Sequence, residues 1–127
     1  MTSAREHFTG VVTAHALAVP MTESTLAVYV VTFEPAARTH WHTHPKGQGL
    51  YVTEGVAVVQ SEGEPPVQLR AGESIWIAAG RRHWHGADSH SQMTHVAYQE
   101  AADDLTTVDW HEPVTAETYF RAVKERH

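Results

Sequence analysis

The sequence predicts an all-β protein, a sandwich or barrel of short strands with one short helix near the C-terminus. Segments rich in β-branched and aromatic residues recur through the first hundred positions, and the longest covers residues 25–33 (TLAVYVVTF). Turn-forming pairs such as Glu54-Gly55 and Ala71-Gly72 separate these segments. Little helical periodicity lies between them, which argues against a fold of alternating strands and helices.

The expected strands are short and follow one another at close intervals, as in a sandwich or barrel. They lie at residues 10–14, 25–33, 49–53, 56–61, 67–69, 74–77 and 93–99. Residues 101–112 are polar and turn-like. Thr115 can then cap a helix that runs to Lys124 and carries an apolar stripe.

Length and composition limit the function classes. A chain of 127 residues suffices for one domain with its own core, and we expect that domain to span residues 1–127, with the barrel at about 8–100 and a tail at 101–127. The absence of cysteine excludes disulfides, thiolate chemistry and Cys-ligated metal sites. A net charge of -6 with nine basic residues argues against nucleic acid or an anionic membrane as a partner. Without a long apolar run or an N-terminal signal, we expect a soluble cytoplasmic protein.

Three histidines at alternate positions form the strongest functional signal. Successive side chains of a strand point to opposite faces, so His40, His42 and His44 are expected to share one face. Imidazole is the commonest metal ligand among side chains, and such a cluster is typical of a metal site. A second cluster, His83-Trp84-His85, follows about forty residues later in what we expect to be a loop. Two segments brought together in a barrel can close a site of several histidines.

At these clusters the chain resembles the cupins. Their first motif combines HxH with an acidic residue or Gln and then Gly, and their second ends in a Gly followed by a His. The matching positions are His42, His44, Gln48 and Gly55 for the first motif, and Gly72, Gly80 and His83 for the second. Ala36 stands where the first motif opens with Gly, and Ala78 stands where the second carries Pro. Both are turn positions, so these departures affect local backbone geometry and leave the ligand set intact.

Longer segments are similar to the small bacterial cupins that include the manganese-dependent hydroxynitrile lyases, over residues 8 to 121. The matching segments include residues 31–35, 41–45, 83–87, 93–95 and 108–110. The resemblance implies a cupin barrel (a double-stranded β-helix, or jelly roll) and one divalent metal per subunit. Manganese is expected first, with iron, nickel or zinc as alternatives. The implied ligands are His42, His44, Gln48 and His83.

The same resemblance implies which residues act on a small-molecule substrate. His95 and His85 are the acid–base candidates. The expected substrate pocket contains Tyr29, Val31, Thr39, Gln99 and His40. Tyr29 is bulkier than the residue that the lyases carry there, which predicts a narrower pocket. Five further histidines are isolated in the sequence and expected on the surface: His7, His15, His90, His111 and His127.

Three functions remain open from the sequence. The first is cleavage of a cyanohydrin into an aldehyde and hydrogen cyanide, the second is a metal-dependent dioxygenase reaction, and the third is small-molecule binding without turnover. The resemblance also implies a homodimer or homotetramer. Residues 25–33 are expected to form an exposed edge strand that a second copy covers, together with the aromatic tail at Tyr119-Phe120.

Overall fold

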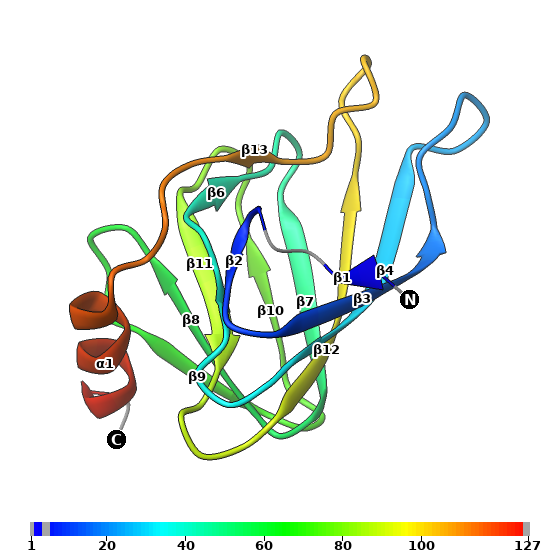
Figure 1. Ribbon diagram of the computed structural model, residues 1–127. Helices are drawn as coiled ribbons and strands as arrows, with labels where there is room; N and C mark the ends of the chain where they lie inside the picture. Colours follow the sequence, from blue (N-terminus) through cyan, green and yellow to red (C-terminus); the bar gives the residue numbers. More distant parts are fainter. Residues whose placement is uncertain (1, 4–5, 126–127) are drawn as a thin grey trace.

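Two antiparallel β-sheets face each other in the computed structural model, which describes residues 2–3 and 6–125 (Figure 1). The first sheet contains, in order, β1 (Thr2–Ser3), β3 (Val12–Ala18), β4 (Leu26–Phe33), β12 (Met93–Glu100), β7 (Gln48–Glu54) and β10 (Ser74–Ile77). The second contains β13 (Asp109–Trp110), β6 (His42–Thr43), β11 (His83–Ala87), β5 (Arg38–Thr39) and β2 (Phe8–Thr9), with β8 (Val56–Ser61) beside β11 and β9 (Val67–Arg70) beside β8. The predicted all-β class is confirmed.

The core lies between the two sheets, and β12 shows how alternation fills it. Met93, His95, Ala97 and Gln99 are buried, whereas the residues between them are half-buried or exposed. One part of the interior is apolar and includes Phe33, Leu50 and Val52. His95 and Gln99 therefore reach the interior on the same strand face, as the alternation predicts.

The strand β4 lies inside its sheet and not at an edge. It pairs with β3 on one side and with β12 on the other. The expectation that residues 25–33 form an exposed edge is therefore wrong, because the N-terminal segment supplies the neighbouring strand β3. Tyr119 is also fully buried, so only Phe120 of the aromatic tail is exposed.

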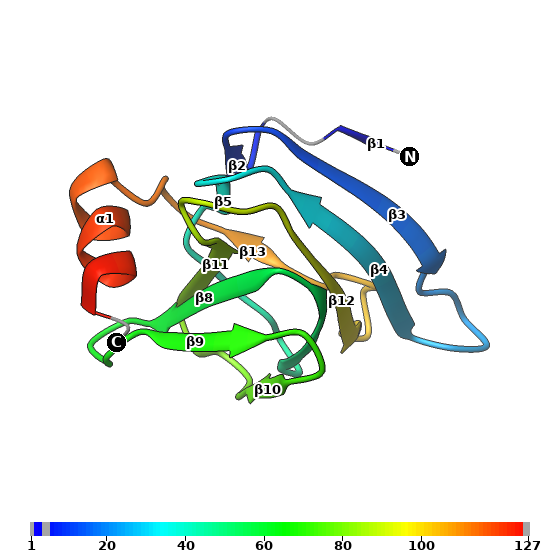
Figure 2. The ribbon, with the colours of Figure 1, turned by 90° about the horizontal axis from the view of Figure 1, so that it is seen from below.

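The C-terminal helix α1 (Ala116–Glu125) packs against the outside of the second sheet (Figure 2). Its N-terminus is capped as predicted, because Thr118 donates its backbone N–H to Thr115 Oγ1 at 3.1 Å. Tyr119 donates its hydroxyl to the carbonyl of Ala87 at 2.7 Å, and its ring lies 5.9 Å from that of Trp84. Among the described residues, no helix is long and apolar enough to cross a bilayer.

Two local features depart from the sequence-based prediction. The segment His83–Ala87 is a strand and not a loop, and all five of its residues are buried. Ala36, in the turn between β4 and β5, has a φ of 68°. This is the left-handed region that Gly adopts without strain, so the chain keeps the turn of the Gly motif with an alanine in it.

Candidate functional site

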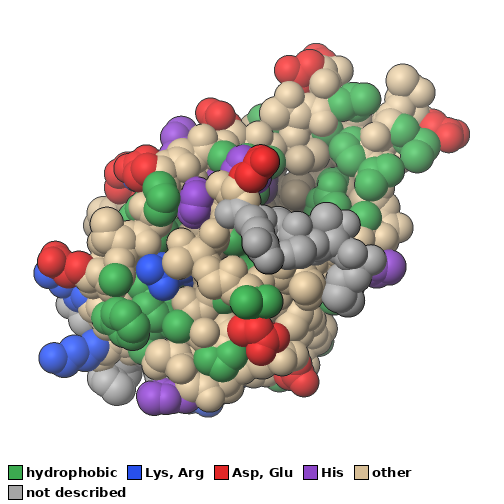
Figure 3. All heavy atoms as spheres, viewed as in Figure 1, with side chains coloured by type: hydrophobic (Ala, Val, Ile, Leu, Met, Phe, Trp, Pro, Cys, Tyr) green, Lys and Arg blue, Asp and Glu red, His purple; other side chains and the backbone are tan. Residues whose placement is uncertain are grey.

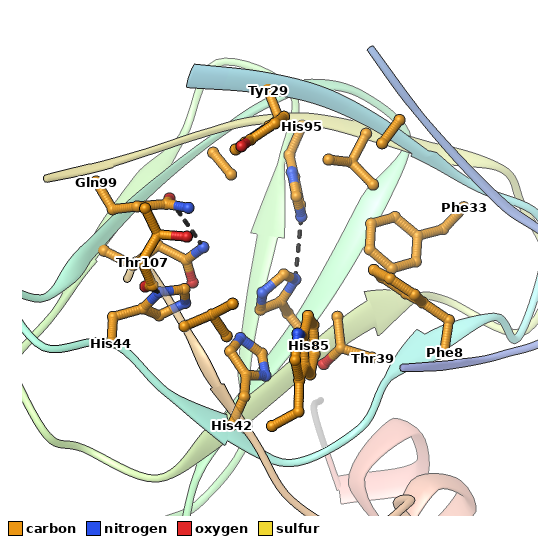
Figure 4. A pocket seen from close by; sticks show the side chains of 16 residues that line it. Phe8, Tyr29, Phe33, Thr39, His42, His44, His85, His95, Gln99 and Thr107 are labelled. Atoms are coloured by element: carbon orange, nitrogen blue, oxygen red, sulfur yellow. Dashed lines mark hydrogen bonds between the residues drawn. The ribbon is translucent and has the colours of Figure 1, made fainter. Parts of the chain in front are cut away.

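A cavity of about 240 Å³ lies between the sheets and is lined by residues from both (Figure 4). One wall is mostly apolar and carries Phe8, Ala14, Tyr29, Val31, Phe33, Ala97, Val108 and Trp110. The remaining lining residues are polar: Thr39, His42, His44, Gln48, His85, His95, Gln99 and Thr107. A small cavity that joins an apolar wall to a few convergent polar groups is typical of a small-molecule site.

Strand pairing brings the two histidine clusters together. His42 of β6 is the direct cross-strand partner of His83 of β11, and their ring centroids are 4.2 Å apart. His44 lies two residues beyond His42, with its ring 5.0 Å from that of His42 and 5.5 Å from that of His83. His85 lies two residues beyond His83 on the same face of β11.

Three of these imidazoles are fixed in one tautomer by the backbone. Each places Nδ1 on a carbonyl oxygen: His42 on His40 at 2.9 Å, His44 on Thr107 at 2.6 Å, and His83 on Arg81 at 2.9 Å. A carbonyl only accepts, so each Nδ1 carries the proton and each Nε2 presents a lone pair. Metal-ligating histidines have this arrangement, in which the far ring nitrogen donates to a carbonyl.

Three ring nitrogens, one of them from His85, converge on one region. One ring nitrogen from each of His42, His83 and His85 lies within 4.8 Å of the other two, and such a three-histidine group can hold a metal ion. Gln48 Oε1 lies 3.1 Å from His83 Nε2, so two acceptors face each other there. His44 Nε2 is buried without a partner among the described residues. A cation would satisfy these acceptors. The side chains that surround the region therefore fit a metal ion.

Burial keeps His42, His44 and His83 uncharged. It lowers the pKa of His83 from 6.5 to about 4 and lowers that of His44 as well. Burial, followed by the neighbouring His83 and His44, lowers the pKa of His42 well below its ordinary value. Neutral imidazole is the form that binds metal, so the site is suited to an ion near neutral pH.

His85, a member of the three-histidine group, also pairs with His95. His95 Nε2 is 3.0 Å from His85 Nδ1, as the dashed line in Figure 4 shows. Burial lowers the pKa of His95 to about 4, and burial together with His95 lowers that of His85 well below its ordinary value. The ring of Phe33 packs against both imidazoles, at 6.0 Å from His85 and 5.2 Å from His95.

Most of the predicted site residues meet at this cavity. Those that line it are Tyr29, Val31, Thr39, His42, His44, Gln48, His85, His95 and Gln99. His83 lies directly behind them, against His42 and Gln48. His40 does not line the cavity, and the predicted alternation fails there because the chain leaves the strand conformation at His40 and Trp41, between β5 and β6.

Several lining residues were not predicted. Thr107, Val108 and Trp110 belong to the stretch that the sequence marks as polar and turn-like, and Phe8 comes from β2. The resemblance to family segments at residues 108–110 was the sequence signal that pointed to this part of the cavity. His7 is not an isolated surface residue, because its ring stacks on Trp110 at 4.5 Å. His15, His90 and His111 are exposed as expected, and His127 lies outside the described residues.

Comparison with known proteins agrees with this architecture. A model of the cupin domain matches residues 29–97. The (R)-mandelonitrile lyase of Granulicella tundricola is 46% identical over 114 residues, which cover 90% of this chain and 86% of that protein. A crystal structure of a cupin-like protein from Thermotoga maritima superposes with a TM-score of 0.88 at 36% identity, covering 97% of this chain and 92% of the other. The lyase DddQ of Ruegeria pomeroyi, which acts on DMSP, shares the fold at a TM-score of 0.67 and 21% identity, over 87% of this chain and 54% of that one. The chain belongs to the cupin family.

Proposed function

We propose that this cupin is a metal-dependent lyase that cleaves cyanohydrins to an aldehyde and hydrogen cyanide. It also catalyses the reverse reaction, the addition of hydrogen cyanide to the aldehyde. One observation carries the proposal. The paired histidines His85 and His95 share a single cavity with His42, His44 and Gln48, in a chain 46% identical to an (R)-mandelonitrile lyase. A base and a cation site within one small cavity are what the removal of a hydroxyl proton and the departure of cyanide require.

The proposed ligands of one divalent ion per subunit are His42, His44, Gln48 and His83. Backbone carbonyls accept Nδ1–H of His42, His44 and His83, which keeps Nε2 of each ring free for the ion. Nδ1 of His85 instead faces Nε2 of His95, an imidazole nitrogen that can donate or accept, so the tautomer of His85 is not fixed in this way. All four proposed ligands are neutral, so they leave the full charge of the ion in place. Manganese is the first expectation for the ion. When bound, it would supply the positive charge that favours an anionic oxygen or cyanide beside it.

The protein groups supply the proton transfers. His95 takes the hydroxyl proton of the cyanohydrin, the C–O bond becomes C=O, and the C–CN bond breaks with its electron pair on the cyanide carbon. The protonated histidine then returns the proton to cyanide and is neutral again. Thr39 Oγ1 accepts the backbone N–H of His85 at 3.1 Å, which leaves its own O–H available to a substrate oxygen or nitrile. The apolar wall receives the aldehyde substituent and excludes water.

The decisive experiment is cleavage of mandelonitrile by the manganese-loaded protein with and without O₂. We expect benzaldehyde to form at the same rate in both cases, because no step uses an oxidant. Consumption of O₂ in proportion to product would replace the lyase by a dioxygenase. Absence of any cleavage would favour a binding protein without turnover.

We also propose that the protein forms a homodimer or homotetramer. The loops that follow β3 and β12 project from the barrel, and exposed hydrophobic side chains gather there (Figure 3). In these loops Val19 is 50% exposed, Met21 44% and Leu105 42%. Exposed apolar area of this kind favours contact with another chain. Light scattering at micromolar concentration is expected to give a multiple of the monomer mass, and a monomer mass would contradict the proposal.

A further inference from the structure

The two ends of the Gln48 amide have opposite chemistry in the histidine group. Its Oε1 lies 3.1 Å from His83 Nε2, and that nitrogen carries a lone pair because His83 Nδ1 donates to the carbonyl of Arg81. With the oxygen turned this way, Gln48 adds an acceptor to those of the imidazoles. A half-turn of the amide would replace this acceptor by an N–H donor, which no cation can use. The orientation of the amide therefore decides whether Gln48 belongs to the site.

Gln99 holds the other end of this amide. Gln48 Nε2 donates to Gln99 Oε1 at 3.3 Å, and both side chains are buried, with 3% and 6% of their surface exposed. The contact is built into the sheet, because Gln48 begins β7, Gln99 lies near the end of β12, and these strands pair at Gly49 and Tyr98. Figure 4 shows the Gln99 side chain inside the cavity, where a dashed line marks this hydrogen bond.

We infer that Gln99 is a positioning residue for the metal site. By accepting the N–H of Gln48, it keeps the amide nitrogen on its own side and turns the oxygen toward the histidines. This inference rests on the proposed function, in which Gln48 is a ligand. It gives Gln99 a role beyond lining the substrate pocket, since its effect reaches the ion through Gln48 and needs no substrate.

A double-mutant cycle on metal affinity tests the inference. Gln48→Met, Gln99→Met and the double variant keep side-chain length but remove the hydrogen bond. The readout is the dissociation constant for Mn²⁺, measured by calorimetry on metal-stripped protein with a competing chelator. Loss of a group that orients a ligand typically weakens metal binding about 10–100-fold, which is the expectation for Gln99→Met. In the Gln48→Met background, Gln99→Met should have no further effect.

A conservative variant separates positioning from charge. Gln99→Glu can only accept, so it should hold the Gln48 nitrogen at least as firmly and keep Mn²⁺ affinity at or above that of the parent. This advantage over Gln99→Met should vanish when Gln48 is Met, whereas simple attraction by the carboxylate would persist. Gln92→Met, at an exposed position before β12, is the matched control and should leave affinity unchanged.

Two results would overturn the inference, and they are distinguishable. If Gln99→Met weakens binding equally in both backgrounds, or not at all in the parent, then Gln99 does not act through Gln48 and the proposed ligand set still stands. If Gln48→Met itself leaves the dissociation constant unchanged, then Gln48 is not a ligand, and that part of the proposed function fails with the inference.

Discussion

His95 Nε2 and His85 Nδ1 lie 3.0 Å apart, and the outer nitrogen of each ring is buried without a partner among the described residues. One proton occupies the shared hydrogen bond. The ring that donates it has a bare outer nitrogen, and the ring that accepts it carries an outer N–H. In either tautomer the pair therefore presents one acceptor and one donor, and this arrangement suits a group that takes up a proton and returns it.

Replacing His95 by Ala is expected to reduce cyanohydrin cleavage by about 10²–10⁴-fold, the usual contribution of a general base. Elemental analysis should find the metal still bound, because His95 is not among the proposed ligands. His90→Ala, at an exposed histidine, is the matched control and should keep full activity. An unchanged rate in His95→Ala would remove the base from the proposed reaction.

Replacing His42 and His44 together by Ala is expected to strip the ion while the barrel stays folded, since a core of this size needs no metal. Elemental analysis and circular dichroism measure the two effects. His85→Ala is the informative comparison, because one ring nitrogen of His85 also lies within 4.8 Å of those of His42 and His83. We expect His85→Ala to keep the metal. Loss of metal there, with retention in the double variant, would reverse the ligand assignment.

Tyr29 is expected to restrict the size of the aldehyde. It lines the cavity from β4, where its cross-strand neighbours are the small residues Ala16 and Ala97, so its ring is the bulky group at this position of the sheet. Tyr29→Ala should raise kcat/KM for bulky aromatic cyanohydrins about tenfold relative to mandelonitrile, a size effect common for apolar pockets. Tyr29→Phe keeps the ring and should retain the parent ratio. Equal ratios in all three proteins would show that Tyr29 does not limit the pocket.

Stability of the metal-free protein is expected to fall in acid. The pKa of His95 is lowered by burial from 6.5 to about 4, so between these values the unfolded chain binds a proton that the folded chain does not. The free energy of unfolding should therefore decrease as pH falls from about 6.5 to 4, by up to about 3 kcal/mol for this residue. Urea unfolding at pH 7 and pH 4.5 measures it. In His95→Gln the free energy of unfolding should differ less between the two pH values than in the parent. An equal difference would contradict the assignment of this pH dependence to His95.

Ala36→Gly is expected to stabilise the fold by about 0.5–1 kcal/mol. The φ of 68° costs an alanine about 1–2 kcal/mol, and the greater freedom of Gly in the unfolded chain offsets part of the gain. Ala37→Gly is the control, because Ala37 is 2% exposed and belongs to the apolar core, so this change should destabilise. Urea unfolding at neutral pH compares the two variants. Destabilisation by Ala36→Gly would mean that packing of the methyl group outweighs backbone strain.

Strands with a clear chemical pattern were predictable from the sequence, and those without one were not. Residues 56–61 and 74–77 were placed as the structure has them, because β-branched runs there are bounded by Gly and Pro turns. The strand His83–Ala87 was missed because it is buried on both faces, between the cavity and α1, so it shows no alternation of polar and apolar residues. The cross-strand pairing of His42 with His83 is a long-range register that no local pattern encodes.

The site was predictable only as far as its motifs reach. His42, His44 and Gln48 follow from spacing together with resemblance, whereas His40 was misplaced because strand alternation was carried across a break in the strand. Thr107 and Trp110 line the cavity from a segment that has no hydrophobic periodicity. Its path across the barrel depends on contacts with residues distant in the sequence, which the whole fold determines.

The bond between His44 Nδ1 and the Thr107 carbonyl joins two parts of the chain that are 63 residues apart. If His44 Nε2 binds the ion as proposed, then ion binding and docking of the segment after β12 are linked equilibria, and each strengthens the other by the same free energy. Backbone amides around Thr107 should therefore exchange with solvent more slowly once the histidines are engaged. Slow release of the ion then becomes a property of the tail as well as of its ligands.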